Sequence, residues 1–165
     1  ALQAFATAQG VNLQHVKPHG ALYTMAVKNT AIWDAVAEAI AAVDARLILF
    51  VLAGTERKNL EAIGARHGIR MAYEFFGDRA YNSDGSLVSR NEPGAVIHDS
   101  EVVAAKILKM VKEGKVECRD GSEIKLTADT ICVHGDNPSA LSLVQKIGET
   151  LQAAGVEIAP PETFL

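Results

Sequence analysis

HVKPHGALY, residues 15–23, is the stretch around which the rest of the chain is organised. It ends an apolar segment that starts at Val11, and it runs into a helical pattern. A strand that stops at Lys17, Pro18 and His19 before a helix occupies the position where α/β proteins place their chemistry. Because Pro18 restricts the backbone on both sides, the lysine cation and the titratable histidine are held in place. The stretch predicts a functional loop, although an ordinary strand-to-helix turn would carry the same pattern.

The remaining chain alternates between short apolar segments and amphipathic ones. Periodicity predicts five strands, over residues 11–16, 46–53, 69–75, 130–134 and 156–159. It predicts helices over residues 1–9, 21–27, 31–43, 56–67, 101–113 and 139–154, and a hairpin over residues 116–126 around Asp120-Gly121. This alternation predicts parallel strands with right-handed crossovers, arranged as an open sheet or as most of a barrel.

Polar residues predict how two of the helices begin. Thr55 is a candidate N-cap for the helix over residues 56–67. Asn137 is a candidate N-cap for the helix over residues 139–154, with Pro138 at the tolerated first position. In that last helix we expect four apolar side chains to be buried, those of Leu141, Val144, Ile147 and Leu151.

Composition limits the class of protein. The 165 residues suffice for a sizeable core, and we expect a single α/β domain over residues 1–165. With 48% hydrophobic and 22% charged residues and a formal net charge of −4, the chain is typical of a soluble globular protein. It has no basic run suited to nucleic acid, and its best apolar run, residues 47–53, is too short for a membrane span. Cys118 and Cys132 lack the spacing of a metal site, which indicates a reduced, cytoplasmic setting.

Polar side chains accompany the ends of three predicted strands. The carboxyl ends of parallel strands meet at one edge of a sheet, so we expect these side chains to converge on a common cavity. Residues 76–99 form a segment of the length seen in functional loops, and its aromatic content favours an ordered one. The side chains concerned are Lys17 and His19 after the first strand, Glu74, Asp78 and Arg79 at the third, and His134 and Asp136 after the fourth.

Titratable groups give this cavity a range of acid–base chemistry. His19 and His134 suit general acid–base catalysis or metal binding. Asp136 suits orienting a histidine, holding a cation or accepting a proton, and Glu74 and Asp78 are further acid–base candidates. Two histidines and one carboxylate leave a metal site open. Spacing alone supports it weakly, and we assign no metal ligand.

Cations supply the complementary half of the predicted site. Lys17, Arg79 and Arg90 suit binding of a carboxylate, a phosphate or a developing oxyanion. Several familiar sequence signatures are missing: there is no GxxxxGK[ST], no HExxH and no GxSxG. A phosphate-binding loop of the P-loop type is therefore excluded for this segment.

Four ordered motifs carry a family resemblance: KPHGALY at residues 17–23, EFFGDRAY at 74–81, GSLVSRNEPGAVIHD at 85–99 and ICVHGDNPSA at 131–140. Together they make the sequence similar to the LamB/YcsF (lactam-utilisation) family over residues 1–160. That family corresponds to the A subunit of the prokaryotic ATP-dependent 5-oxoprolinase.

The resemblance implies a fold, a reaction and partners. The implied fold is a distorted (β/α) barrel of the glycoside hydrolase/deacetylase type. The implied role is the hydrolytic opening of 5-oxoproline to L-glutamate, coupled to ATP hydrolysis and carried out with the B and C subunits. ATP would come with a divalent cation, which we expect to be magnesium. The matched positions are His19, Glu74, Asp78, His134 and Asp136 as catalytic candidates, and Lys17, Tyr23, Arg79, Tyr81, Arg90 and Gly135 as substrate- or phosphate-binding candidates.

One departure concerns the N-terminus. Family members are longer there, and their opening strand carries an acidic, glycine-rich motif that this chain lacks. We therefore expect an N-terminally truncated sequence and an incomplete barrel, whose activity alone is in question. An exposed sheet edge is a hazard unless it is covered, so we also expect homo-oligomer contacts or a companion fragment.

Two other functions stay open. The first is a metal-dependent hydrolase or deacetylase that acts on a carbohydrate or amide without ATP, for which metal analysis of the full-length protein is the test. The second is a non-catalytic scaffold or binding subunit whose partners carry the chemistry. Ligand binding without turnover would point to the latter.

Overall fold

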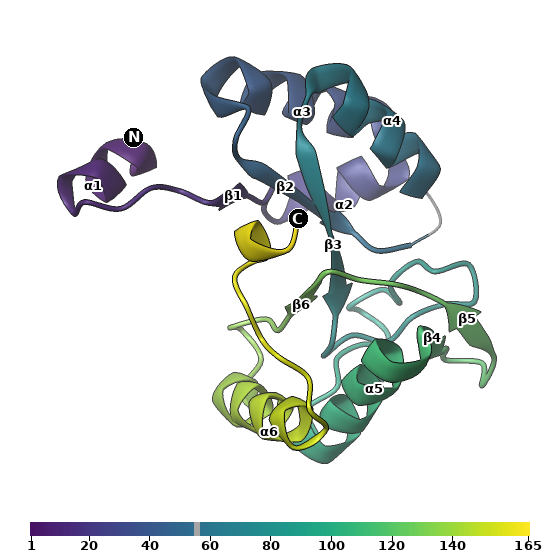
Figure 1. The fold of residues 1–165 in the computed structure, drawn as a ribbon. Helices are drawn as coiled ribbons and strands as arrows, with labels where there is room; N and C mark the ends of the chain where they lie inside the picture. Colours follow the sequence, from purple (N-terminus) through teal and green to yellow (C-terminus); the bar gives the residue numbers. More distant parts are fainter. Residues whose placement is uncertain (55–56) are drawn as a thin grey trace. The chain divides into compact units, whose positions relative to one another are not determined.

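The computed structural model describes residues 1–54 and 57–165 (Figure 1). These residues fall into two compact units, which we describe separately. Residues 1–52, 57–72 and 164–165 belong to the first unit, and residues 53–54 and 73–163 belong to the second. The predicted N-cap Thr55 and the predicted helix start at residue 56 lie outside the described residues.

The first unit pairs two parallel strands and carries four helices among its described residues. Its elements are α1 (Leu2–Ala8), β1 (His15–Val16), α2 (Ala21–Lys28), α3 (Thr30–Asp44), β2 (Ile48–Leu52), α4 (Arg57–His67) and the start of β3 (Arg70–Phe76). Strand β1 pairs with β2 in the register His15 to Ile48 and Val16 to Leu49. Helices α3 and α4 lie side by side (Figure 1). Every residue of β2 is buried, as its continuous apolar sequence predicts.

The second unit contains the end of β3 and all later elements. These are α5 (Ser100–Glu113), β4 (Lys115–Glu117), β5 (Glu123–Lys125), β6 (Thr130–Cys132), α6 (Ala140–Ala153) and the 3₁₀ turn η1 (Pro161–Thr163). Strand β3 pairs in parallel with β6, and β4 pairs antiparallel with β5 as the predicted hairpin. Helices α5 and α6 pack side by side (Figure 1).

The strands outside the hairpin are hydrogen-bonded in the order β1-β2-β3-β6. This order and the parallel pairs confirm the α/β class. The glycoside hydrolase/deacetylase type of barrel and the single domain stay predictions.

The predicted fifth strand, residues 156–159, is wrong, since this segment follows α6 without strand pairing. Ile158 is 68% exposed there, and Pro160 and Pro161 follow without backbone donors. Strand β1 is also shorter than the predicted residues 11–16.

Helix α6 buries a different set of apolar side chains from the predicted one. Leu143, Ile147 and Leu151 are buried, whereas Leu141 is 73% exposed and Val144 is 55% exposed. Both stripes satisfy helical spacing, so the sequence pattern alone does not choose between them. The packing of α6 against α5 decides which stripe is covered.

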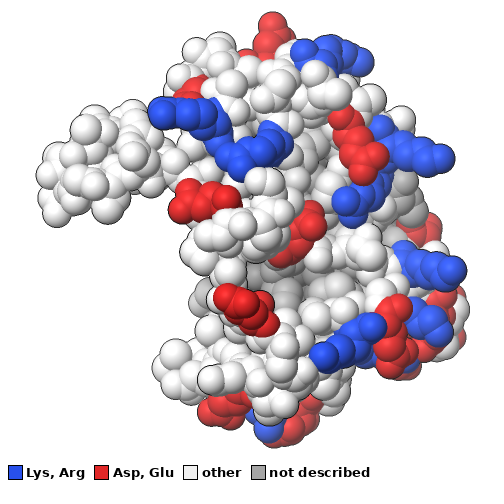
Figure 2. All heavy atoms as spheres, viewed as in Figure 1, with Lys and Arg blue, Asp and Glu red and all other residues white. Residues whose placement is uncertain are grey.

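No helix in the described part of the chain is long and apolar enough to cross a membrane. On the face drawn in Figure 2, basic and acidic side chains are interspersed and do not gather by sign.

Candidate functional site

The ends of β3 and β6 lie next to each other in the second unit. Phe76 pairs with Cys132, and the Gly77 N–H donates to the Cys132 carbonyl oxygen at 3.0 Å, which extends the pairing by one residue. A Cβ at Gly77 would stand 2.6 Å from Ile107 Cδ1, so glycine lets α5 approach this strand end closely. The register brings Asp78 and His134, one and two residues further on, to the same edge.

Asp78 and His134 form the centre of the site. Asp78 is completely buried, and its Oδ1 accepts a hydrogen bond from His134 Nδ1 at 2.8 Å. Its Oδ2 accepts from the His134 backbone N–H at 3.1 Å. Two bonds from one residue to both carboxylate oxygens fix the imidazole relative to the strand end. The Phe76 ring meets the imidazole edge-on, with 4.7 Å between centroids.

Each member of this pair changes the pKa of the other. The pKa of His134 is raised to about 9, chiefly because its side chain donates to the Asp78 carboxylate. Burial alone would raise the pKa of Asp78. The hydrogen bonds from the side chain and backbone of His134 outweigh this effect of burial, so the net result is a lowered pKa. At neutral pH the pair is therefore an imidazolium beside a carboxylate.

Asn137 connects this pair to the long loop over residues 76–99. Its Nδ2 donates to the Ile97 carbonyl oxygen at 3.1 Å and lies 3.4 Å from Asp78 Oδ2. Its Oδ1 accepts from His98 Nδ1 at 2.8 Å and from the Ser139 N–H at 3.1 Å. The predicted N-cap role is corrected: Ser139 is the N-cap of α6, and the buried Asn137 amide serves the loop and Asp78.

Arg79 and Tyr81 are buried in the same loop. Arg79 Nε donates to the Ala95 carbonyl oxygen at 3.1 Å, and its Nη2 donates to the Val88 carbonyl oxygen at 2.5 Å. The Tyr81 hydroxyl accepts the Phe76 N–H at 2.9 Å. These hydrogen bonds fix the conformation of the loop over residues 79–95. Binding of substrate or phosphate by Arg79 and Tyr81 stays a prediction.

The remaining predicted residues of the second unit differ in exposure. Arg90 Nη1 and Asp136 Oδ2 form an exposed ion pair at 2.6 Å, beside the exposed Gly135. The hydrogen bond from Arg90 lowers the pKa of Asp136. Glu74 is only 3% exposed and lies within β3, opposite Thr130 of β6. Anion binding by Arg90 stays a prediction.

Three predicted residues lie in the first unit, between the end of β1 and the first turn of α2. Lys17 Nζ lies 5.8 Å from the centroid of the Tyr23 ring. The buried Tyr23 ring meets Trp33 edge-on at 5.5 Å, and His19 is exposed in the loop before α2. The convergence of these residues with Asp78 and His134 stays a prediction. Within the described residues, no group of three or more His, Cys, Asp or Glu side chains is placed to hold a metal ion.

Comparison with known protein families places the whole chain in one of them. The model of the LamB/YcsF family matches residues 1–165, the whole chain. The chain belongs to the LamB/YcsF family.

Relatives in the LamB/YcsF family carry informative names. A protein of Alkaliphilus metalliredigens, named as the A subunit of 5-oxoprolinase, is 48% identical over 165 residues, which is 100% of this chain and 63% of the relative. The Bacillus subtilis protein of the same name is 47% identical over 158 residues, covering 96% of this chain and 60% of the relative. The chain therefore spans less than two thirds of these curated relatives.

A solved structure similar to this LamB/YcsF chain agrees with the fold. The lactam utilization protein from Thermus thermophilus superposes with a TM-score of 0.83 at 43% identity, over 96% of this chain and 62% of that one.

Two residues at this LamB/YcsF site were not predicted from sequence. Cys132 Sγ lies 4.0 Å from His134 Nε2, and Asn137 contacts Asp78. The two-residue spacing between Cys132 and His134 at a strand end places both side chains on one face, which is a signal that could have found the cysteine. Asn137 carried a capping signal, which concealed its long-range role.

Proposed function

We propose that this chain is part of the A subunit of an ATP-dependent 5-oxoprolinase. The reaction is the hydrolytic opening of 5-oxoproline, a cyclic amide, to L-glutamate with ATP hydrolysis, carried out with the B and C subunits. The family membership and the names of the relatives support this proposal. One observation in the chain itself carries it: the His134 imidazole held by the buried Asp78 at the strand ends.

The chemistry of a lactam explains why such a pair is useful. A lactam carbonyl is a poor electrophile, and phosphorylation of its oxygen by ATP would activate the ring carbon. One water then adds to that carbon, and the C–N bond breaks to leave a glutamyl phosphate and the free amine. A second water adds at the same carbon and releases phosphate, so the lactam oxygen ends in phosphate. The ring nitrogen must gain a proton when the C–N bond breaks.

His134 is suited to supply that proton. Asp78 accepts from Nδ1, so the other ring nitrogen, Nε2, is directed away from the carboxylate. With its pKa raised to about 9, the imidazole is protonated at neutral pH and acts as a general acid. This refines the broader sequence-based role of His134 as acid or base.

The substrate carboxylate and the phosphates of ATP need cations to bind them, and Arg90 is an exposed candidate. Arg90, whose ion pair with Asp136 is exposed, can exchange that carboxylate for a substrate carboxylate or phosphate. Lys17, at the end of β1, is the second candidate. ATP would bring a divalent cation, expected to be magnesium, that neutralises phosphate charge.

The test uses the full-length protein assembled with its B and C subunits. 5-Oxoproline labelled with ¹⁸O at the ring carbonyl is expected to give ¹⁸O-phosphate and L-glutamate. His134→Gln should lower glutamate release by about 100-fold or more. His67→Gln is the matched control, because His67 pairs with Asp34 in the first unit. An unlabelled phosphate product, or wild-type turnover by His134→Gln, would overturn the proposal.

A further inference from the structure

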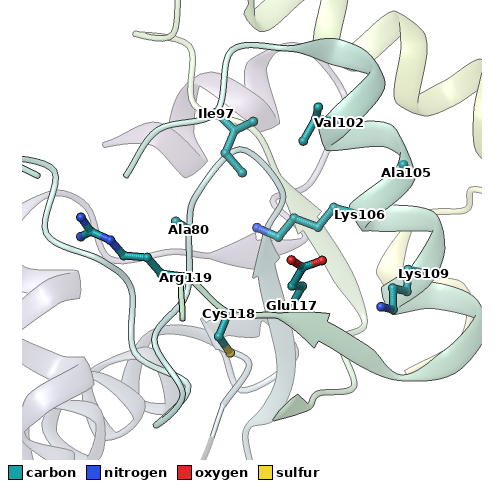
Figure 3. A pocket seen from close by; sticks show the side chains of 9 residues that line it. All are labelled: Ala80, Ile97, Val102, Ala105, Lys106, Lys109, Glu117, Cys118 and Arg119. Carbon is teal, nitrogen blue, oxygen red and sulfur yellow. The ribbon is translucent and has the colours of Figure 1, made fainter. Parts of the chain in front are cut away.

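A cavity of about 480 Å³ lies in the second unit, beside α5 and the hairpin strand β4 (Figure 3). Its apolar walls include Ile97, Val102 and Ala105. Cavities of this size hold small metabolites, and mostly apolar walls with a few polar groups are typical of ligand sites. The acid–base pair described above does not line it.

Lys106 is the side chain that gives this cavity a chemical character. It extends from α5 across the cavity (Figure 3). Its ammonium lies 5.1 Å from the centroid of the Phe75 ring and 5.0 Å from that of Tyr81, and it donates to the Arg79 carbonyl oxygen. In the described part of the chain, no carboxylate forms an ion pair with it.

Unlike Lys106, the other two cations that line the cavity each form an ion pair with a carboxylate. Lys109 and Arg119 also line the cavity, but Lys109 pairs with Glu123 and Arg119 pairs with Glu92. Lys106 is thus a cation that is partly removed from water and that contacts two aromatic faces and one carbonyl, and the charge of the buried Asp78 favours its protonated form without forming an ion pair with it. Burial lowers its pKa to about 8, which is the physical consequence of that environment.

We propose that this cavity binds a small organic monoanion, whose carboxylate pairs with Lys106 and whose apolar body packs against Ile97, Val102 and Ala105. A bound carboxylate would form the direct ion pair that the ammonium lacks among the described residues, and the apolar walls would cover the rest of the ligand.

The charge of the ligand is limited by Glu117. This residue ends β4 and lines the cavity, on the wall that faces Lys106 of α5 (Figure 3). Because Lys109 and Arg119 are already paired and Glu117 adds a carboxylate to the lining, Lys106 is left to pair with one negative charge of the ligand, and a second charge would be repelled. The site therefore favours monoanions over dianions, and this conclusion does not depend on the proposed 5-oxoprolinase role.

The test titrates the full chain with benzoate and follows methyl resonances by NMR. Benzoate should give saturable shifts at Ile97, Val102 and Ala105, and Lys106→Met should weaken its binding by about tenfold or more. Lys112→Met is the matched control, because Lys112 lies on the same helix but contacts the Ala154 carbonyl oxygen.

A second comparison requires no variant. Benzamide has the shape of benzoate without its charge, and it should bind the wild-type chain about tenfold or more weakly. Absence of saturable shifts with benzoate, equal affinities for benzoate and benzamide, or unchanged benzoate affinity in folded Lys106→Met would each overturn the proposal.

Discussion

Asn137 Nδ2 lies 3.4 Å from Asp78 Oδ2, although the two residues are 59 positions apart in the sequence. The same amide group donates to the Ile97 carbonyl oxygen, so one buried side chain connects the carboxylate, the long loop and the segment that follows β6. Orientation of His134 thus depends on contacts beyond the Asp78–His134 pair.

Asn137→Ala is expected to destabilise the fold by about 1–3 kcal/mol, because the Ile97 carbonyl oxygen and Asp78 lose a buried donor. Urea unfolding measures the change. Asn91→Ala, at an exposed position of the same loop, should change stability by less than about 0.5 kcal/mol. Equal midpoints for the wild-type chain and Asn137→Ala would contradict the role assigned to the amide.

His134 should titrate near pH 9, well above the ordinary range of histidine. Because the pKa of His134 is higher in the folded state than in the unfolded state, its protonation stabilises the folded state. This stabilisation is fully present below about pH 6.5 and is lost as the pH rises through about 9. NMR titration of the imidazole measures the pKa directly. Asp78→Asn should bring it back toward 6.5, since the largest cause of the shift is removed. A histidine pKa that stays near 9 in that variant would show that Asp78 is not the cause.

Arg79→Lys is expected to loosen the loop over residues 79–95. A lysine ammonium cannot reproduce the geometry in which Nε and Nη2 donate to Ala95 and Val88, so a cost of about 2–4 kcal/mol follows. Limited proteolysis of the loop and urea unfolding are the measurements. Arg119→Lys is the control, because its ion pair with Glu92 is exposed and contributes little. Similar effects of the two substitutions would argue against a structural role for Arg79.

Tyr81→Phe removes only the hydroxyl that accepts the Phe76 N–H. The donor is then left without this buried partner, and we expect a loss of about 1–2 kcal/mol in thermal or chemical unfolding. Tyr81→Leu should cost more, since the ring also stacks on Phe75 at 5.2 Å between centroids. If both substitutions cost the same, the hydroxyl alone accounts for the effect and the stacking contributes nothing.

Gly77→Ala should destabilise the second unit by about 1–3 kcal/mol, because the new Cβ would meet Ile107 Cδ1 at 2.6 Å. Ile107→Val removes that Cδ1. The double variant Gly77→Ala with Ile107→Val should therefore be less destabilised than the sum of the single variants, which urea unfolding can show. Strict additivity would mean that the close approach is not the reason for glycine.

The amino-acid pattern identified the elements well where the signal is local. The run Leu47 to Ala53 predicted the buried strand β2, and the helical pattern over residues 101–113 predicted α5 to within one residue. It failed where two patterns satisfy the same local rule. Residues 156–159 are apolar enough for a strand but do not pair, and α6 buries Leu143 in place of Leu141.

For the candidate site too, the sequence predicted the local features but not the long-range contacts. The residue types after each strand pointed to Asp78 and His134 as functional groups, because parallel strand ends share one edge. The amino-acid sequence alone thus specified the α/β class, the family motifs and the side chains available for chemistry. It took the folded chain to show that Asp78 holds His134, that Asn137 ties the loop to them, and that Arg79 and Tyr81 are buried. The physical reason is distance along the chain: local periodicity fixes each element, whereas contacts between residues 56 or 59 positions apart follow from strand register and packing.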